Sequence, residues 1–533
     1  MSPIAGTATL LRLMARRDRI RTPAWIAGIV FFAAYVTIEV AALGDDPHSL
    51  ANSAVLFADA MGRLMTGPAL GLDAPSSARF FAAGYALFVY ILFALMAIFT
   101  VIRHTRADEQ SGRTELVRAN VVGIHAQLTS ALIITAFGAV VSALGVFAVA
   151  LARGYPAGGS ALIAITALAV ALFFAGVAAL SAQLFESSRA ASGLAGAVLA
   201  TAYALRMIGD AARSGGSPPS WLSPLGWAQQ TGPFVLDRWW PLALLAGFGL
   251  AFLLAGFRLA EFRDVGSAIF SGRPGRATGG PVLGTPLGLA ARLLRPGFAA
   301  WGISLAIAAA VFGAYSASIA GSADTLPEEL TKVLSADDLS GGYLAFMVLI
   351  FGVFASAAAA GALGQLRGDE LRGRTELLLA SGAGRGRHLA AQLTVIAAAS
   401  ILICLATGLA TGVGAFASGT DDTHVIADLL LAGANQIPAV LAVIGIVVAF
   451  FGSLPRFAAA AGWAVIGFGG FVTAFGELLD LPQPLKNLNV FGHVAAYPVD
   501  PVAWQPIAWL LLIAAAGVAA GFAGWSRREV DHA

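Results

Sequence analysis

The feature that most restricts this sequence is a series of apolar runs of about twenty residues, each long enough to cross a ~30 Å hydrocarbon core as a helix. Inside a bilayer the backbone must satisfy its own hydrogen bonds, which leaves helices as the simplest solution for such runs. The sequence therefore predicts an all-α polytopic membrane protein with about twelve transmembrane helices. The predicted spans lie near 24–43, 80–103, 125–151, 161–184, 189–208, 240–258, 298–320, 343–366, 389–416, 425–451, 457–478 and 504–525.

The amino-acid composition also indicates an integral membrane protein. Of the 533 residues, 58% are hydrophobic and 12% are charged, whereas soluble domains carry about 25% charged residues. The net charge of +2 is too small to indicate a nucleic-acid partner, so none is expected. The single cysteine, Cys404, excludes an intrachain disulfide. The seven histidines lack metal-binding spacing, so neither a metal site nor a catalytic residue is expected.

The distribution of basic residues predicts the orientation of the spans. With both termini in the cytoplasm, eight of the 32 Lys and Arg residues fall outside and the rest fall inside, as the positive-inside rule requires. The eight outer residues are Arg63, Arg79, Arg153, Arg206, Arg213, Arg238, Lys332 and Lys486. Two outer loops, near 44–78 and 321–342, each contain a candidate amphipathic helix; in the second, Leu330, Val333 and Leu334 share one face.

A charged segment occurs twice, 261 positions apart, and each copy follows the second span of one half of the chain. RADEQSGRTEL at 106–116 and RGDELRGRTEL at 367–377 agree at eight of eleven positions. We call these the first and second charged segments. Their repetition predicts two tandem six-helix halves, 1–258 and 298–533, joined by a cytoplasmic linker and connecting helix over 259–297. Parallel halves of this kind imply a two-fold axis along the membrane normal, an arrangement found in transporters.

Two interpretations of the charged segments remain open on the residues alone. Each segment is a short cytoplasmic helix that presents carboxylates and an arginine to another protein, or it is an internal brace. In the helical form Glu109 and Arg113 stand at i, i+4, as Glu370 and Arg374 do, which favours an ion pair within each segment. Gly112 and Gly373 permit a bend or a close approach of another backbone.

The segments resemble the coupling helices of type-2 ATP-binding-cassette (ABC) exporter permeases. The two-times-six layout and SPLGWAQQ in an outer loop are similar to the actinobacterial exporters of tetronasin-type polyketide antibiotics. That resemblance implies a multi-pass protein of the bacterial plasma membrane that exports amphipathic or apolar compounds. It also assigns ATPase coupling to Asp108, Glu109, Gly112, Arg113, Glu115, Asp369, Glu370, Gly373, Arg374 and Glu376.

The sequence contains no motif that would hydrolyse ATP. A P-loop needs Gly-Lys followed by Ser or Thr, and the only two lysines follow Thr331 and Leu485. No cofactor is therefore expected in this chain. The resemblance implies a separate ABC ATPase subunit, in two copies, that would bind ATP and Mg²⁺. The alternative function is a proton-coupled efflux carrier of the major-facilitator kind, which also has twelve spans and a charged motif after the second span of each half.

Ionisable and amide side chains within or near the spans are candidates for the substrate path, because burying them in lipid is costly unless they find partners. Arg206 and Asp210 stand one helical turn apart, so an ion pair between them would equally serve as a structural brace. Asn435 and Gln436, followed by Pro438, are expected to interrupt the tenth span. The complete set of substrate-path candidates is Glu39, Arg206, Asp210, Asn435, Gln436 and Glu477.

Overall fold

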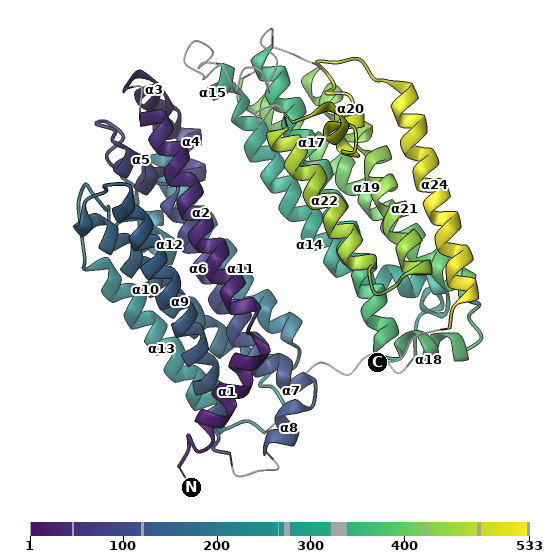
Figure 1. The fold of residues 1–533 in the computed structure, drawn as a ribbon, viewed down its shortest axis with the longest axis horizontal. Coiled ribbons are helices and arrows are strands. Elements are labelled where there is room, and N and C mark those ends of the chain that lie inside the picture. The colour runs from purple at the N-terminus through teal and green to yellow at the C-terminus, as the bar shows by residue number, and fades with distance from the viewer. Residues whose placement is uncertain are drawn as a thin grey trace. The chain divides into compact units, whose positions relative to one another are not determined.

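The computed structural model describes residues 2–44, 47–118, 122–264, 266–270, 278–320, 338–419, 424–476 and 481–529. The chain divides into two compact units, Met1–Pro274 and Gly275–Ala533. Within the described residues the regular structure is helical, apart from one isolated bridge between Phe185 and Phe270. Figure 1 shows long, nearly parallel helices in each unit.

Unit 1 begins with the amphipathic helix α1, which buries Leu10 and Met14 and leads into the first long helix. At the opposite end of the unit, short helices α3, α4 and α5 fill the loop between the first two spans. The helices are α1 (Thr7–Arg17), α2 (Arg21–Gly44), α3 (Pro47–Ala58), α4 (Ala60–Thr66), α5 (Ser77–Gly84), α6 (Ala86–Ile102), the π-helical turn η1 (Arg103–Ala107), α7 (Asp108–Gln110), α8 (Arg113–Arg118), α9 (Ala126–Ala152), α10 (Ala157–Leu184), α11 (Ser188–Ala212), η2 (Pro218–Leu222), α12 (Pro224–Gln229) and α13 (Pro241–Glu261).

Unit 2 repeats the same order of long helices with different connections. Its elements are η3 (Pro281–Gly284), α14 (Pro286–Ala314), α15 (Ser316–Ala320), α17 (Leu339–Leu371), α18 (Arg374–Ala380), α19 (Arg385–Ala417), α20 (Val425–Asn435), α21 (Ile437–Ser453), α22 (Ala458–Phe475), α23 (Gln483–Lys486), η5 (Phe491–His493) and α24 (Trp504–Arg527). The expected outer amphipathic helix around Leu330 lies outside the described residues.

The prediction of an all-α polytopic membrane protein is confirmed. Eleven helices in the described part of the chain are long and apolar enough to span a bilayer. The remaining predicted span, 457–478, corresponds to a shorter apolar helix, Ala458–Ala474. Residues 286–297, the end of the predicted linker and connecting helix, are helical and continue into the seventh span as α14, because Thr285 caps the helix at Gly288 and Pro286 occupies its first turn.

The centre of each unit is formed by the second and fourth spans of that half. In unit 1, α6 and α10 are the most buried long helices, and in unit 2 the corresponding helices are α17 and the α20–α21 span. The flanking helices, including α2, α13, α14 and α24, keep most of their surface for lipid. Leucine, valine and phenylalanine fill the space around the central helices, with Phe93 and Phe174 fully buried in unit 1.

The sixth span of each half packs against the fourth span through glycines. In unit 1 a Cβ atom at Gly176 would lie 2.4 Å from the carbonyl oxygen of Gly249. In unit 2 a Cβ atom at Gly452 would lie 2.1 Å from the carbonyl oxygen of Gly521, and one at Gly517 would lie 2.4 Å from that of Gly445. Small residues let helix backbones approach closely where lipid provides no hydrophobic drive between helices. These contacts fix α13 on α10 and α24 on α21.

The glycine contact in unit 1 predicts opposite effects for two alanine substitutions in the same helix. A Cβ atom at Gly249 would lie 2.9 Å from the Cα atom of Phe173, whereas the exposed Gly247 has no neighbour within 4 Å. We expect Gly249→Ala to destabilise the protein by about 1–3 kcal/mol through overpacking. Gly247→Ala should be neutral or stabilising by up to about 1 kcal/mol, because alanine favours the helix. Thermal unfolding of the purified protein in detergent measures both, and equal shifts would contradict the packing argument.

Candidate functional site

Each charged segment is divided by its glycine into two parts. In unit 1 the span α6 continues through η1 and α7 to Gln110, Gly112 adopts a left-handed φ of 74°, and α8 starts at Arg113. In unit 2 the span α17 runs to Leu371, Gly373 has a φ of 71°, and α18 starts at Arg374. Figure 1 shows α8 and α18 turning away from the long helices of their own units. The expectation of one short continuous helix in each segment was therefore wrong, because a left-handed residue ends the first helix.

The glutamate before the bend in unit 1 is held by two arginines. Glu109 accepts hydrogen bonds from both terminal nitrogens of Arg263, at 2.7 and 2.8 Å, and Arg106 donates to the same carboxylate. The three side chains are at least 91% buried. Because Arg263 follows the end of α13, this bidentate pair ties the second span to the sixth. We call Arg106, Glu109 and Arg263 the first clamp.

Unit 2 builds the same arrangement from its own residues. Both terminal nitrogens of Arg528 donate to the Glu370 carboxylate, one of them at 2.9 Å, and Arg367 lies 2.8 Å from it. Glu370 is fully buried. Arg528 follows the end of α24, and its guanidinium also stacks over the rings of Trp525 and Phe451. We call Arg367, Glu370 and Arg528 the second clamp.

The clamps correct the pairing expected within each segment. Arg113 lies 3.4 Å from Asp108, and Arg374 lies 3.0 Å from Asp369, whereas the glutamates pair with the clamp arginines. The i, i+4 geometry does not apply because Gly112 and its counterpart break the helix between the two partners. The buried glutamates therefore act as internal braces.

Asp108 also links the first charged segment to the N-terminal helix. Arg17 at the end of α1 donates to Asp108 at 2.7 Å. This hydrogen bond to a carboxylate raises the pKa of Arg17, so its guanidinium stays charged at any physiological pH. Asp369 in unit 2 is partly exposed and pairs with Arg374. The two segments thus share the clamp and differ in what surrounds it.

After the glycine, the arginine and the leucine of each segment are exposed, whereas the threonine that follows the arginine, Thr114 or Thr375, is buried. The side chains of Arg113 and Arg374 are 61% and 60% exposed. Leu116 and Leu377 are 75% and 74% exposed, which is unusual for leucines at the same place in two repeats. Glu115 is exposed and Glu376 is half-buried. We call Arg113, Glu115 and Leu116 the first exposed edge, and Arg374, Glu376 and Leu377 the second.

The Arg206–Asp210 pair lies at the other end of unit 1, with the charged groups 3.7 Å apart. Arg206 is fully buried and donates to the carbonyls of Arg63, Leu64 and Met65 in the last turn of α4. Gln229 donates to the next carbonyl, that of Thr66, at 2.6 Å. A cation on the free carbonyls of a helix C-terminus is stabilising. This arrangement holds the outer helix α4 on α11.

The remaining substrate-path candidates are scattered. Asn435 ends α20 and donates to the carbonyl of Ala495 at 3.0 Å, and Gln436 occupies the turn before α21, so the expected interruption of the tenth span is confirmed. The side-chain oxygens of both amides are buried without a hydrogen-bond partner among the described residues. Glu39 is exposed on α2. Glu477 lies outside the described residues.

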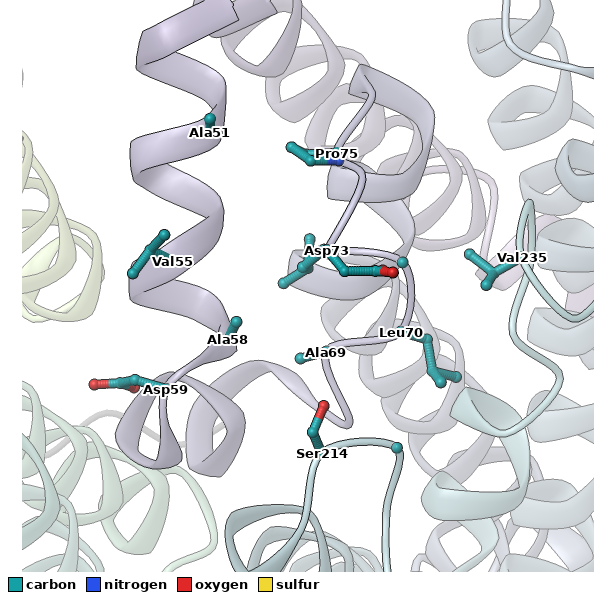
Figure 2. Close-up of a pocket in the computed structure, with 13 residues that line it drawn as sticks. Ala51, Val55, Ala58, Asp59, Ala69, Leu70, Asp73, Pro75, Ser214 and Val235 are labelled. Carbon is teal, nitrogen blue, oxygen red and sulfur yellow. The ribbon is translucent and has the colours of Figure 1, made fainter.

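Each unit has a cleft at the end opposite its charged segment. The cleft in unit 1 has a volume of about 810 Å³. Figure 2 shows Ala51, Val55 and Ala58 of α3 on one side and Asp73 and Pro75 of the following loop on the other. A cleft of about 630 Å³ in unit 2 is lined by residues that include Thr473, Asn489 and His493. No described substrate-path candidate lines either cleft, and no group of three His, Cys, Asp or Glu side chains in the described ranges could hold a metal.

Sequence reasoning missed Arg263 and Arg528, although both left a signal. Each arginine is followed directly by an acid, in the dipeptides Arg263-Asp264 and Arg528-Glu529, and each dipeptide follows the sixth span of its half. A search for repeats outside the charged segments would have paired them. Their partners could not be assigned from spacing, because the glutamates lie more than 150 positions earlier in the chain.

The first clamp predicts strong, non-additive effects on stability. Glu109→Ala would leave Arg106 and Arg263 buried without their carboxylate, so it should cost about 3–5 kcal/mol. Arg263→Ala should cost less, because Arg106 still pairs with Glu109. The double substitution should cost clearly less than the sum of the two. Glu115→Ala, an exposed glutamate of the same segment, is the matched control and should change stability by less than about 0.5 kcal/mol. Thermal unfolding of the four variants checks this, and additive losses would mean that the pair contributes no coupling energy.

Comparison with known proteins places this architecture among drug efflux systems. The family model "Multidrug efflux system permease Rv1217c, C-terminal domain" matches residues 283–526. The multidrug efflux system permease protein Rv1217c of Mycobacterium tuberculosis (strain ATCC 25618 / H37Rv) is 35% identical over 541 residues, which cover 99% of this chain and 96% of that protein. Together with the apolar helices, this similarity identifies a multi-pass protein of the bacterial plasma membrane. The chain belongs to the family of multidrug efflux permeases that includes Rv1217c.

Proposed function

We propose that this chain is the membrane-spanning subunit of a type-2 ABC exporter, driven by a separate ATPase that docks on the two exposed edges. The observation that carries the proposal is the duplicated contrast within the charged segments. In both, the glutamate before the bend is buried in a clamp, while an arginine and a leucine after the bend stay exposed. Arginine is enriched at protein–protein interfaces, and a leucine exposed near it at the same place in both repeats supports a docking surface there.

Through the clamps, the part of each charged segment before its glycine would have a mechanical role in coupling. A push on α8 would act on the end of α6 and, through the Glu109–Arg263 pair, on the end of α13. A push on α18 would act on the end of α17 and, through the Glu370–Arg528 pair, on the end of α24. Since a bidentate ion pair fixes both distance and orientation, two helices would move together in each unit.

The proposed ATPase would act as two copies, one for each exposed edge, and would bind ATP and Mg²⁺ in its own P-loops. The proposed direction is outward, with the edges on the cytoplasmic side, as the distribution of arginines indicates. Cargo would be amphipathic or apolar; the resemblance to tetronasin-type exporters favours polyketide antibiotics. The name of the related Rv1217c protein supports drug efflux.

The exposed edges predict which substitutions release the ATPase. Leu116→Asp and Leu377→Asp together should abolish co-purification of a P-loop ATPase from the native host while leaving the thermal stability of the permease unchanged, because both side chains face solvent. Leu488→Asp, a 68% exposed leucine in the outer loop after α23, is the matched control and should retain the ATPase. Unchanged co-purification of the double variant would exclude the exposed edges as the docking surface.

The energy source gives a second test. In inside-out vesicles that contain the permease and its ATPase, uptake of an amphipathic drug should require ATP hydrolysis and should persist when a protonophore removes the proton gradient. The Leu116→Asp/Leu377→Asp variant should lose this uptake, and the Leu488→Asp control should keep it. Transport driven by a proton gradient without ATP or the ATPase would instead identify a secondary carrier.

A further inference from the structure

A second cleft in unit 1 lies at the end that carries the charged segment. It has a volume of about 550 Å³ and is enclosed by the start of α2, the end of α6 with η1, and the start of α11. Its basic residues are Arg21 and Arg103, its hydroxyl groups come from Thr22, Thr100, Ser188 and Ser192, and its apolar residues include Trp25 and Phe99. Such a lining, polar on one side and aromatic on the other, suits an amphipathic ligand.

The charge in this cleft is positive despite a carboxylate. Asp18 is 4% exposed, and its two oxygens lie 3.0 Å from Arg103 Nε and 2.7 Å from His104 Nε2. Its negative charge is therefore already matched by Arg103 before any ligand binds. Arg21 is exposed and makes no ion pair or hydrogen bond with another described side chain. The cleft thus presents a cation without a counter-ion.

The aromatic wall lies on the membrane side of the basic groups. Trp25 is one helical turn further into α2 than Arg21, and its ring stacks on Phe99 with 6.4 Å between the centroids. Phe99 is 50% exposed on α6. Tryptophan at this depth is typical of the boundary between headgroups and acyl chains. The order along the helices, from arginine to aromatic rings, follows the order of a phospholipid from phosphate to acyl chain.

We propose that this cleft binds the phosphate headgroup of an anionic phospholipid from the cytoplasmic leaflet. Arg21 would pair with the phosphate, the hydroxyls of Thr22 and Ser192 would donate to its oxygens, and the first part of an acyl chain would lie on Phe99. Basic pockets between transmembrane helices on the cytoplasmic side are suited to such headgroups. The site is independent of the proposed ATPase contact, so either proposal stands if the other fails.

The cleft lies next to the first charged segment, so a bound lipid would contact residues that hold this segment in place. Ala107 lines the cleft one residue before Asp108, which carries the ion pair to Arg17. Ser188, also in the lining, donates from both its amide and its hydroxyl to the side chain of Gln110. A headgroup in the cleft would therefore contact the same turn of α11 that holds the first charged segment in place.

The test compares two neighbouring arginines. Binding of phosphatidylglycerol would be measured by the thermal shift of the purified permease in phosphatidylcholine nanodiscs with and without phosphatidylglycerol, and by the lipid retained in native mass spectrometry. Wild type should be stabilised by phosphatidylglycerol, and Arg21→Gln should bind it about fivefold more weakly, since a single arginine contributes on the order of a fivefold change at a membrane surface. Arg19→Gln removes the same charge from an exposed residue that does not line the cleft, so it should bind like wild type.

Two further arms separate this site from other sources of the effect. Ser192→Phe narrows the cleft without changing its charge and should also weaken lipid retention. Inorganic phosphate and glycerol 3-phosphate should not reproduce the stabilisation, because they lack the acyl chains that reach Phe99. Equal losses in Arg21→Gln and Arg19→Gln would show a diffuse surface attraction, and full stabilisation by either soluble phosphate would show a free-anion site; each result would overturn the proposal.

Discussion

The arrangement of both units depends on a buried glutamate at the end of the second span, paired with an arginine beyond the sixth. Both carboxylates are shielded from solvent, since the Glu109 side chain is 9% exposed and Glu370 is fully buried. Two arginines around one carboxylate also leave each clamp with a net positive charge. A charge pair in such a place is costly to break, because each partner alone would be an uncompensated buried charge. The second and sixth helices of each unit are therefore fixed to each other at this end.

The clamp acts together with the glycine contacts to attach the sixth helix along its length. In unit 1, α13 meets α10 through Gly249 and Gly256, and Arg263 then fixes its end to Glu109. In unit 2, α24 meets α21 through Gly517 and Gly521 and ends at the second clamp. Glycine contacts allow close approach but specify little about rotation or sliding. The bidentate ion pair supplies that specification, since it fixes a guanidinium relative to a carboxylate.

Features of the fold that depend on neighbouring residues could be predicted from the sequence, whereas contacts between residues far apart in the chain could not. The spans and the duplication come from local signals, namely apolar length and a repeated segment, and the structure agrees with eleven of the spans. The bend at Gly112 was recognisable only as a possibility, because a glycine permits a left-handed φ without requiring it. The partners of Glu109 and Glu370 depend on helices packed far apart in the chain, and spacing within the segment pointed instead to Arg113 and Arg374. The i, i+4 pairs expected from sequence are replaced by i, i+3 pairs with Arg106 and Arg367 and by tertiary pairs with Arg263 and Arg528.

The two charged segments differ at the positions that do not belong to the clamps. Gln110 accepts two hydrogen bonds from Ser188, whereas Leu371 at the corresponding place is 41% exposed. Asp108 reaches Arg17 of α1, whereas Asp369 at the corresponding place pairs with Arg374 of its own segment. The first segment is therefore tied by polar contacts to α1 and α11, whereas the aspartate of the second pairs within its own segment. The buried triad and the exposed leucine recur in both units, whereas these surroundings do not. The triad and the leucine are therefore the structural features that the two repeats share, and the contacts that support the two exposed edges differ.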